Sequence, residues 1–199
     1  MTKGRLEAYS DGVIAILITI MVLELRAPEG DDTWAVLLHL RSTFLSYVLS
    51  FVFLSIYWNN HHHMLHLTHR INGRILWANA HLLFWLSLVP FTTAWMGGNH
   101  FSALPSAVYG FVLLMAGVAY YLLERLIIRH QGKHSALADA VGGDVKGIMS
   151  VVLYLVAIPM AFVNHWASQA IYITVALMWL VPDKRIESLI GREPERDDR

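Results

Sequence analysis

The sequence contains no cysteine, and only 15% of its 199 residues are charged, whereas 56% are hydrophobic. The lack of cysteine excludes disulfide bonds and leaves the redox compartment unspecified. A soluble domain carries about 25% charged residues, and this chain, with a mean hydropathy of +0.47, has too few polar side chains to cover a water-facing surface. A dense basic face is also lacking, which argues against a nucleic-acid partner. The composition therefore predicts an all-α membrane protein that uses lipid as part of its solvent.

Six apolar segments approach or exceed the length of about 20 residues that a helix needs to cross a bilayer. Pro90 and Pro159 fall inside two of them, where membrane helices tolerate proline with a kink. Only Asn164 and His165 connect the last two segments, which can also be interpreted as one broken hairpin. The predicted spans are residues 8–25, 34–60, 74–96, 103–127, 147–164 and 166–182. We expect one transmembrane domain over residues 1–182 and a charged cytosolic tail over residues 183–199.

The basic residues fall almost entirely on one side of this arrangement. With six spans, the amino terminus and the tail lie on the same side of the membrane. All of the 15 lysines and arginines except Arg26 and Arg41 lie on that side. The opposite side receives the acidic turn at residues 29–32 and the neutral connection at residues 97–107. Because cytoplasmic loops carry the excess of basic residues, we predict a multi-pass protein of the cell (cytoplasmic) membrane with both termini cytosolic.

The first span is short and carries an acid at its head. Only twelve uncharged residues, Gly12–Leu23, separate Asp11 from Glu24, which is about 18 Å of helix against roughly 30 Å of hydrocarbon. We therefore expect this helix to lie among protein neighbours. At about 100° per residue, one stripe of the helix carries four residues, and Asp11 points about 140° away from it. The stripe contains Ile16, Thr19, Ile20 and Leu23. On this evidence alone it predicts a packed helix–helix seam, with the Thr19 hydroxyl bonded to a carbonyl one turn earlier.

A motif at the head of this span changes that interpretation. It consists of an arginine, three variable positions, an aromatic–Ser–Asp cluster and a glycine, here Arg5, Tyr9, Ser10, Asp11 and Gly12. This pattern, with the later Leu23-Glu24 step, resembles the signature of the transmembrane protein 175 family, where the aromatic residue is usually phenylalanine. Two further stretches resemble the end of that family's second helix and a stretch within its third helix, namely Trp58-Asn59-Asn60-His61-His62 and Pro90-Phe91-Thr92-Thr93. The resemblance covers about the first half of the chain.

The resemblance implies a potassium-permeable channel in which four six-helix subunits form a homotetramer around one pore. The family has no glycine-rich carbonyl filter, and its first helices line the pore instead. Carried over to this chain, it implies a hydrophobic constriction at Ile16, further rings at Ile20 and Leu23, and a hydroxyl ring at Thr19 that contributes to selectivity. The expected partners are membrane lipid and permeant K⁺, without a cofactor or a metal.

Polar residues cluster at the predicted cytosolic ends of the first three spans. A buried acid with basic neighbours forms a satisfied network in a membrane protein, so we assign these residues a structural or gating-support role. They are Arg5, Ser10, Asp11, His61, His62 and His81.

The density of histidines at residues 61–69 leaves an alternative open. His62 and His66 are spaced i, i+4, which is compatible with metal binding. The same spacing is also compatible with interfacial histidines that are hydrogen-bonded to their neighbours. The sequence thus predicts an ion channel, with a secondary transporter as the alternative and a membrane metalloprotein as a third possibility. No signature of an enzyme stands out, and a transporter would normally show an internal inverted repeat.

Overall fold

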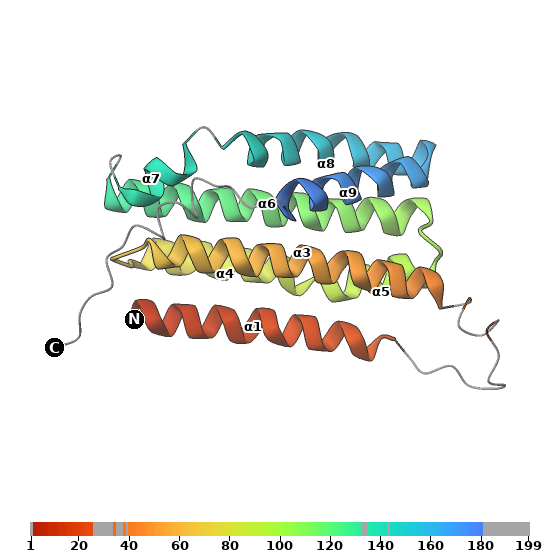
Figure 1. Ribbon diagram of the computed structural model, residues 1–199, viewed down its shortest axis with the longest axis horizontal. Coiled ribbons are helices and arrows are strands. Elements are labelled where there is room, and N and C mark those ends of the chain that lie inside the picture. Colours follow the sequence, from red (N-terminus) through yellow and green to blue (C-terminus); the bar gives the residue numbers. More distant parts are fainter. Residues whose placement is uncertain are drawn as a thin grey trace.

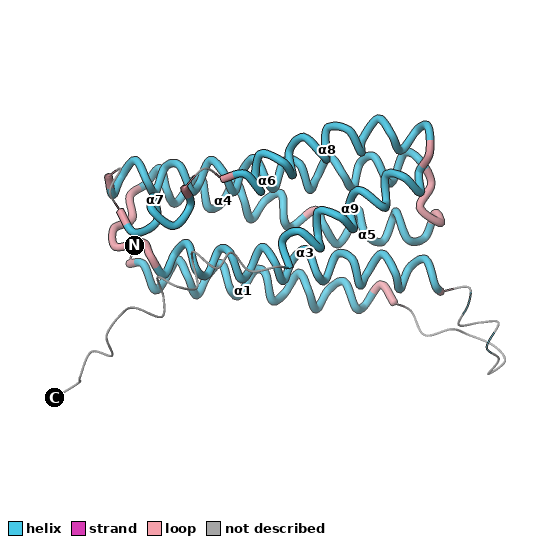
Figure 2. Tube along the Cα trace, turned by 45° about the horizontal axis from the view of Figure 1, so that its top comes forward, coloured by secondary structure: helices cyan, strands magenta, loops and turns pink. Residues whose placement is uncertain are grey.

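The computed structural model describes residues 2–25, 40–132, 135–142 and 144–180, together with Trp34 and Leu38. The regular structure among these residues is entirely α-helical (Figure 2), which confirms the predicted fold class. The acidic turn at residues 29–32 and the predicted tail at residues 183–199 lie outside the described residues, so both stay predictions.

Long helices lie roughly side by side and form an elongated bundle (Figure 1). The elements are α1 (Lys3–Leu23), α3 (Arg41–His66), α4 (Gly73–Ser87), α5 (Val89–Gly98), α6 (Ala103–Gln131), α7 (Ala136–Val141), α8 (Val145–Val163) and α9 (His165–Leu180). Five helical segments in the described part of the chain are long and apolar enough to span a membrane, with α4 and α5 together forming one of them. The sixth predicted span, α9, has 16 residues, or about 24 Å of helix.

The helix boundaries differ from the predicted ones at both ends of the bundle, and the largest difference is that α3 begins at Arg41, whereas the second span was predicted to begin at residue 34. At the end that carries the amino terminus, α1 begins at Lys3 and α3 continues to His66. The backbone is helical in these two polar stretches although they lie outside the predicted spans. The third span is interrupted at Leu88, two residues before Pro90, since proline lacks the amide that would continue the helix. The polar insert between α6 and α8 contains the short helix α7, which the sequence pattern did not indicate.

Two apolar clusters hold the helices together. The first joins α1 to α3, α4 and one half of α6, and the second joins the other half of α6 to α3, α5, α8 and α9. Helix α6 therefore lies at the centre, and α1 packs only on α3, α4 and α5 among its stronger contacts. At Gly97 the helices α5 and α3 approach so closely that an added Cβ atom would lie 2.8 Å from the Cα atom of Thr43. Glycine is required there because backbone cannot yield to a side chain.

Candidate functional site

Helix α1 has one buried face and one exposed face. The buried face is a continuous ridge of five residues that packs on α3, α4 and α5, namely Leu6, Ser10, Ile14, Leu17 and Met21. The opposite face carries the predicted stripe, with Ile16 56%, Ile20 43% and Leu23 74% exposed. We call Ile16, Thr19, Ile20 and Leu23 the α1 strip. In one subunit this strip does not pack against the subunit's own helices, so the seam expected from the stripe alone is not an intrasubunit one.

Thr19 is the polar member of the α1 strip. Its hydroxyl donates to the carbonyl oxygen of Ile16 at 2.9 Å, as expected for a threonine that bonds back along its helix. The hydroxyl proton is thereby directed into the helix. The oxygen lone pairs remain on the exposed side of α1, where they can accept a hydrogen bond or approach a cation.

A buried chain of hydrogen bonds fastens the amino-terminal half of α1 to α3 and α4. The Asn79 amide donates to the Ser10 hydroxyl at 2.9 Å, and that hydroxyl donates to the Leu6 carbonyl oxygen at 2.9 Å. The amide oxygen of Asn79 lies 2.7 Å from Nε2 of His61, and because an amide oxygen only accepts, Nε2 donates. These three side chains are almost completely buried. We call Ser10, His61 and Asn79 the α1 anchor.

Asp11 makes a second connection at the edge of the anchor. Its carboxylate accepts a hydrogen bond from the Trp58 indole at 3.0 Å, which links α1 to α3 where both side chains are partly or fully exposed. The Trp58 ring stacks on His62, and His62 stacks on His66, with ring centroids 5.9 Å and 6.4 Å apart. The histidines on this face of α3 therefore pack on each other and on tryptophan.

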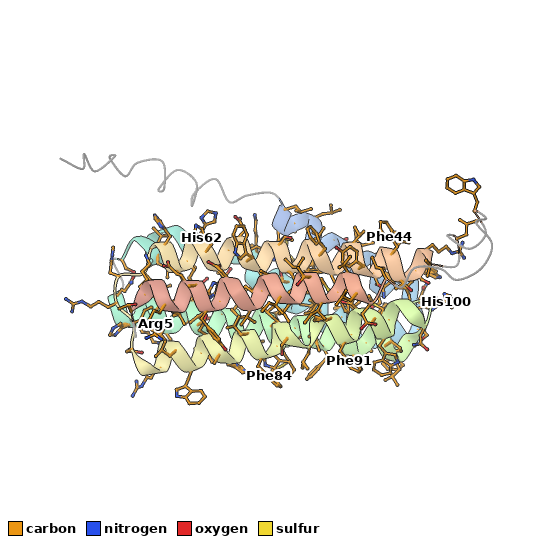
Figure 3. All side chains as sticks on the ribbon, turned by 90° about the horizontal axis from the view of Figure 1, so that it is seen from below. Arg5, Phe44, His62, Phe84, Phe91 and His100 are labelled. Atoms are coloured by element: carbon orange, nitrogen blue, oxygen red, sulfur yellow. The ribbon has the colours of Figure 1, made fainter. Side chains whose placement is uncertain are left out.

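The remaining predicted network residues lie apart from the anchor. Arg5 is exposed at the same end of the molecule as His62 (Figure 3) and makes no hydrogen bond or ion pair within the described part of the chain. His81 accepts a hydrogen bond from the Trp85 indole at 2.9 Å, within α4. No group of three or more histidine, aspartate or glutamate residues is arranged to hold a metal ion among the described residues.

Asn79 is one of the polar residues near the predicted cytosolic end of the third span, but it was not assigned to the predicted network, although it is the central member of the anchor. Its signal was a carboxamide inside an otherwise apolar segment, a side chain that needs partners in a membrane. Ser10 and Asn79 are separated by 69 residues. Their pairing depends on how α1 and α4 pack, which a hydrophobic pattern does not specify.

These features define a multi-pass helical membrane protein whose first helix is anchored on one face and open on the other. Comparison with known proteins agrees, since the family model for the endosomal/lysosomal potassium channel TMEM175 matches residues 5–90. A potassium channel of Chryseobacterium sp. (strain P1-3) is 51% identical over 187 residues, which cover 94% of this chain and 97% of the relative. The chain belongs to the TMEM175 family.

A second relative, a potassium channel of Chamaesiphon minutus, is 29% identical over 189 residues, covering 87% of this chain and 91% of the relative. The crystal structure of a lysosomal potassium-selective channel TMEM175 homolog from the same organism has 28% sequence identity and a TM-score of 0.76. That match covers 90% of this chain and 96% of the solved one. The family suggested by the motif at the head of α1 is thereby confirmed, and the likeness extends well beyond the first half of the chain.

Proposed function

We propose that this protein is a potassium-permeable channel formed by a homotetramer, with the α1 strip of each subunit lining the pore. The observation that carries the proposal is the division of α1 into two faces. One face is packed and hydrogen-bonded to its own subunit, while the α1 strip is left open for a partner or for a pore. Both relatives are named potassium channels, which supports potassium as the permeant ion of this protein.

The physical chemistry of the α1 strip is consistent with a gate. Four isoleucine side chains that meet at an axis form a constriction too apolar and narrow to remain hydrated, so ions do not pass until the ring widens. Ile16 would supply this ring, with Ile20 and Leu23 as further apolar rings. Thr19 would offer four hydroxyl oxygens to a partly dehydrated cation. The sequence contains no glycine-rich carbonyl filter that would perform selection instead.

The anchor and the basic side chains complete the proposal. Ser10, Asp11, His61 and their partners would hold α1 in register, and Arg5, which is exposed in the single subunit, remains available to a neighbouring subunit or a headgroup. The concentration of basic residues on one side supports a position in the cell membrane with both termini cytosolic. The geometry of His62 and His66, whose rings stack on each other, lends no support to the metalloprotein alternative.

Potassium flux from liposomes of defined composition tests this proposal and separates it from the transporter alternative. A channel is expected to dissipate a K⁺ gradient without a coupled ion and at a rate far above carrier turnover, as a fluorescent potassium indicator would report. Empty liposomes provide the baseline. Flux that requires a second ion gradient, or that saturates at a slow turnover, would favour the transporter, and the mass of the detergent-solubilised complex would check the tetramer.

The Thr19→Val variant is expected to lower the selectivity for K⁺ over Na⁺. Valine keeps the shape of threonine but removes the hydroxyl, whose hydrogen bond is worth about 0.5–1.5 kcal/mol. A loss of that size in differential stabilisation corresponds to a roughly twofold to tenfold lower permeability ratio. Reversal potentials under bi-ionic conditions measure the ratio directly. The Thr19→Ser variant keeps the hydroxyl and should retain the wild-type ratio, and equal ratios in all three proteins would contradict the role given to Thr19.

A further inference from the structure

A partly open cavity of about 270 Å³ lies between α3, α6, α8 and α9, on the far side of the molecule from α1. Its wall is mainly apolar or aromatic and includes Phe53, Tyr57, Gly117, Val151, Tyr154 and Trp179. This volume is close to the lower end of the range of about 300–1,000 Å³ that is typical of small-molecule sites. The cavity plays no part in the proposed ion pathway.

Several polar groups of the wall are already hydrogen-bonded within the protein. The Tyr57 hydroxyl donates to the Leu113 carbonyl oxygen at 3.4 Å, and the Tyr120 hydroxyl donates to the Asn60 carbonyl oxygen at 3.1 Å. The Trp179 indole donates to the Ser150 hydroxyl at 2.8 Å. A buried water needs about two to four polar partners, so this wall favours hydrocarbon.

The length and direction of the cavity match one leaflet of a bilayer. Along α8 its wall runs from Asp144, just before the helix, to Tyr154. Those ten residues correspond to about 15 Å of helix, which is half of the roughly 30 Å of bilayer hydrocarbon. Helix α8, which Asp144 caps, begins inward of α7, on the side of the bundle that carries the amino terminus (Figure 1). A cavity of this length would hold the part of an acyl chain that lies within one leaflet.

Charged groups of both signs surround the outer end of the cavity. Asp144 is partly buried, and one carboxylate oxygen caps α8 by accepting from the Gly147 amide at 3.0 Å. Burial raises the pKa of the Asp144 carboxyl, against the lowering effects of the Gly147 amide and Arg125, so a nearby cation would stabilise the ionised form. The Arg125 guanidinium lies 4.8 Å from the Tyr121 ring centroid, and the Lys146 ammonium lies 6.0 Å from that of Trp179. Both rings line the cavity.

We propose that this cavity binds one acyl chain of a phospholipid with a primary-amine, zwitterionic headgroup, taken from the leaflet on the side of the amino terminus. The lipid ammonium would pair with Asp144, and its phosphate would lie near Arg125. An anionic lipid such as phosphatidylglycerol has no ammonium that could pair with the Asp144 carboxylate.

Gly117→Leu tests the acyl-chain site. A Cβ atom added at Gly117 would lie 3.7 Å from the Tyr57 hydroxyl, an ordinary contact, so the longer side chain has room only within the cavity. Gly98→Leu is the matched control because nothing lies within 4 Å of its added Cβ atom and it does not line the cavity. Each full-length protein is reconstituted into vesicles with equal amounts of phosphatidylethanolamine and phosphatidylglycerol, extracted in mild detergent and analysed by native mass spectrometry.

We expect the wild type and Gly98→Leu to retain one phosphatidylethanolamine per subunit. Gly117→Leu should retain at least about tenfold less, since a tenfold change needs about 1.4 kcal/mol, which is less than two buried methylenes contribute. No bound phospholipid in the wild type, or equal retention in all three proteins, would overturn the proposal. The same spectra report the oligomeric state and thus whether each variant is assembled.

A second variant and a cross-linking measurement keep the proposal testable if Gly117→Leu does not fold. Asp144 adopts a left-handed backbone with φ of 37° and caps α8, and asparagine is suited to both roles, so Asp144→Asn removes little but the charge. It should lower the preference for phosphatidylethanolamine over phosphatidylglycerol without lowering total lipid retention. In the wild type, a phosphatidylethanolamine with a photoreactive acyl chain should label residues 148–154. An unchanged preference, or labelling confined to residues outside the cavity wall, would refute the assignment.

Discussion

Replacing Ile16 by asparagine is expected to raise the potassium flux of reconstituted protein by about tenfold or more. The carboxamide would let water occupy the ring that four isoleucines would keep dry in the proposed pore, and a barrier lower by only about 1.4 kcal/mol produces a tenfold rate increase. Ile16 is 56% exposed in the single subunit, so the substitution does not place a polar group in the subunit's own core. Liposome flux and single-channel recording both measure the effect, and the open probability should increase more than the open-channel conductance.

Val22→Asn provides the control for this experiment. Val22 also lies on α1 and is 45% exposed, but at about 100° per residue its side chain is about 120° from that of Ile16. We expect its flux to remain close to wild type because it lies outside the α1 strip. If Ile16→Asn leaves the flux unchanged, or if both variants raise it equally, then the α1 strip does not form the constriction.

Replacing Asn79 by leucine is expected to destabilise the protein by about 1–3 kcal/mol, the cost of a buried polar group that has lost its partner. Leucine is similar in size but cannot accept from Nε2 of His61 or donate to Ser10, the two bonds that Asn79 makes at 2.7 Å and 2.9 Å. Because these bonds hold α1 in place, the proposed tetramer should also assemble less completely. Thermal unfolding in detergent and native mass spectrometry measure the two consequences.

Asn59→Leu is the matched control for Asn79→Leu, since it makes the same chemical change at an exposed position of α3. It should unfold within a few degrees of wild type. A further variant, Ser10→Ala, isolates the other half of the anchor and should be milder, because it leaves the bond between Asn79 and His61 intact. Wild-type stability and assembly in Asn79→Leu would show that the anchor does not hold α1.

The hydrophobic pattern predicted the spans because lipid imposes a minimum apolar length on any helix that crosses it. It located the break in the third span only approximately, through Pro90, since the helix ends at Leu88. It did not predict α7, a six-residue helix in a polar insert where neither length nor periodicity provides a signal. The beginning of α1 at Lys3 was missed because its first turn is too polar to resemble a span.

The candidate site was predicted unevenly, and the reason is geometric. Residues of the α1 strip share one helix, so helical periodicity alone groups Ile16 with Thr19, Ile20 and Leu23. The anchor joins three helices, and its members come together only through packing. Ser10 and His61 were predicted from the family motif, whereas Asn79 required the structure. Arg5 and His81 are polar residues near the same end of the helices, but neither joins the anchor. Arg5 is exposed, and His81 bonds to Trp85 within α4.

Because the anchor lies near one end of α1, the helix is held at that end and can pivot about it. Ser10 accepts a hydrogen bond from Asn79 of α4, whereas the ridge beyond it, from Ile14 to Met21, is held by apolar contacts that permit small slippage. At 1.5 Å per residue, a tilt of about 5° around Ser10 would displace Ile16 by about 0.8 Å and Leu23 by about 1.7 Å. Leu23 would thus move about twice as far as Ile16. If four such helices surround a pore, it would widen more at the Leu23 end than at Ile16.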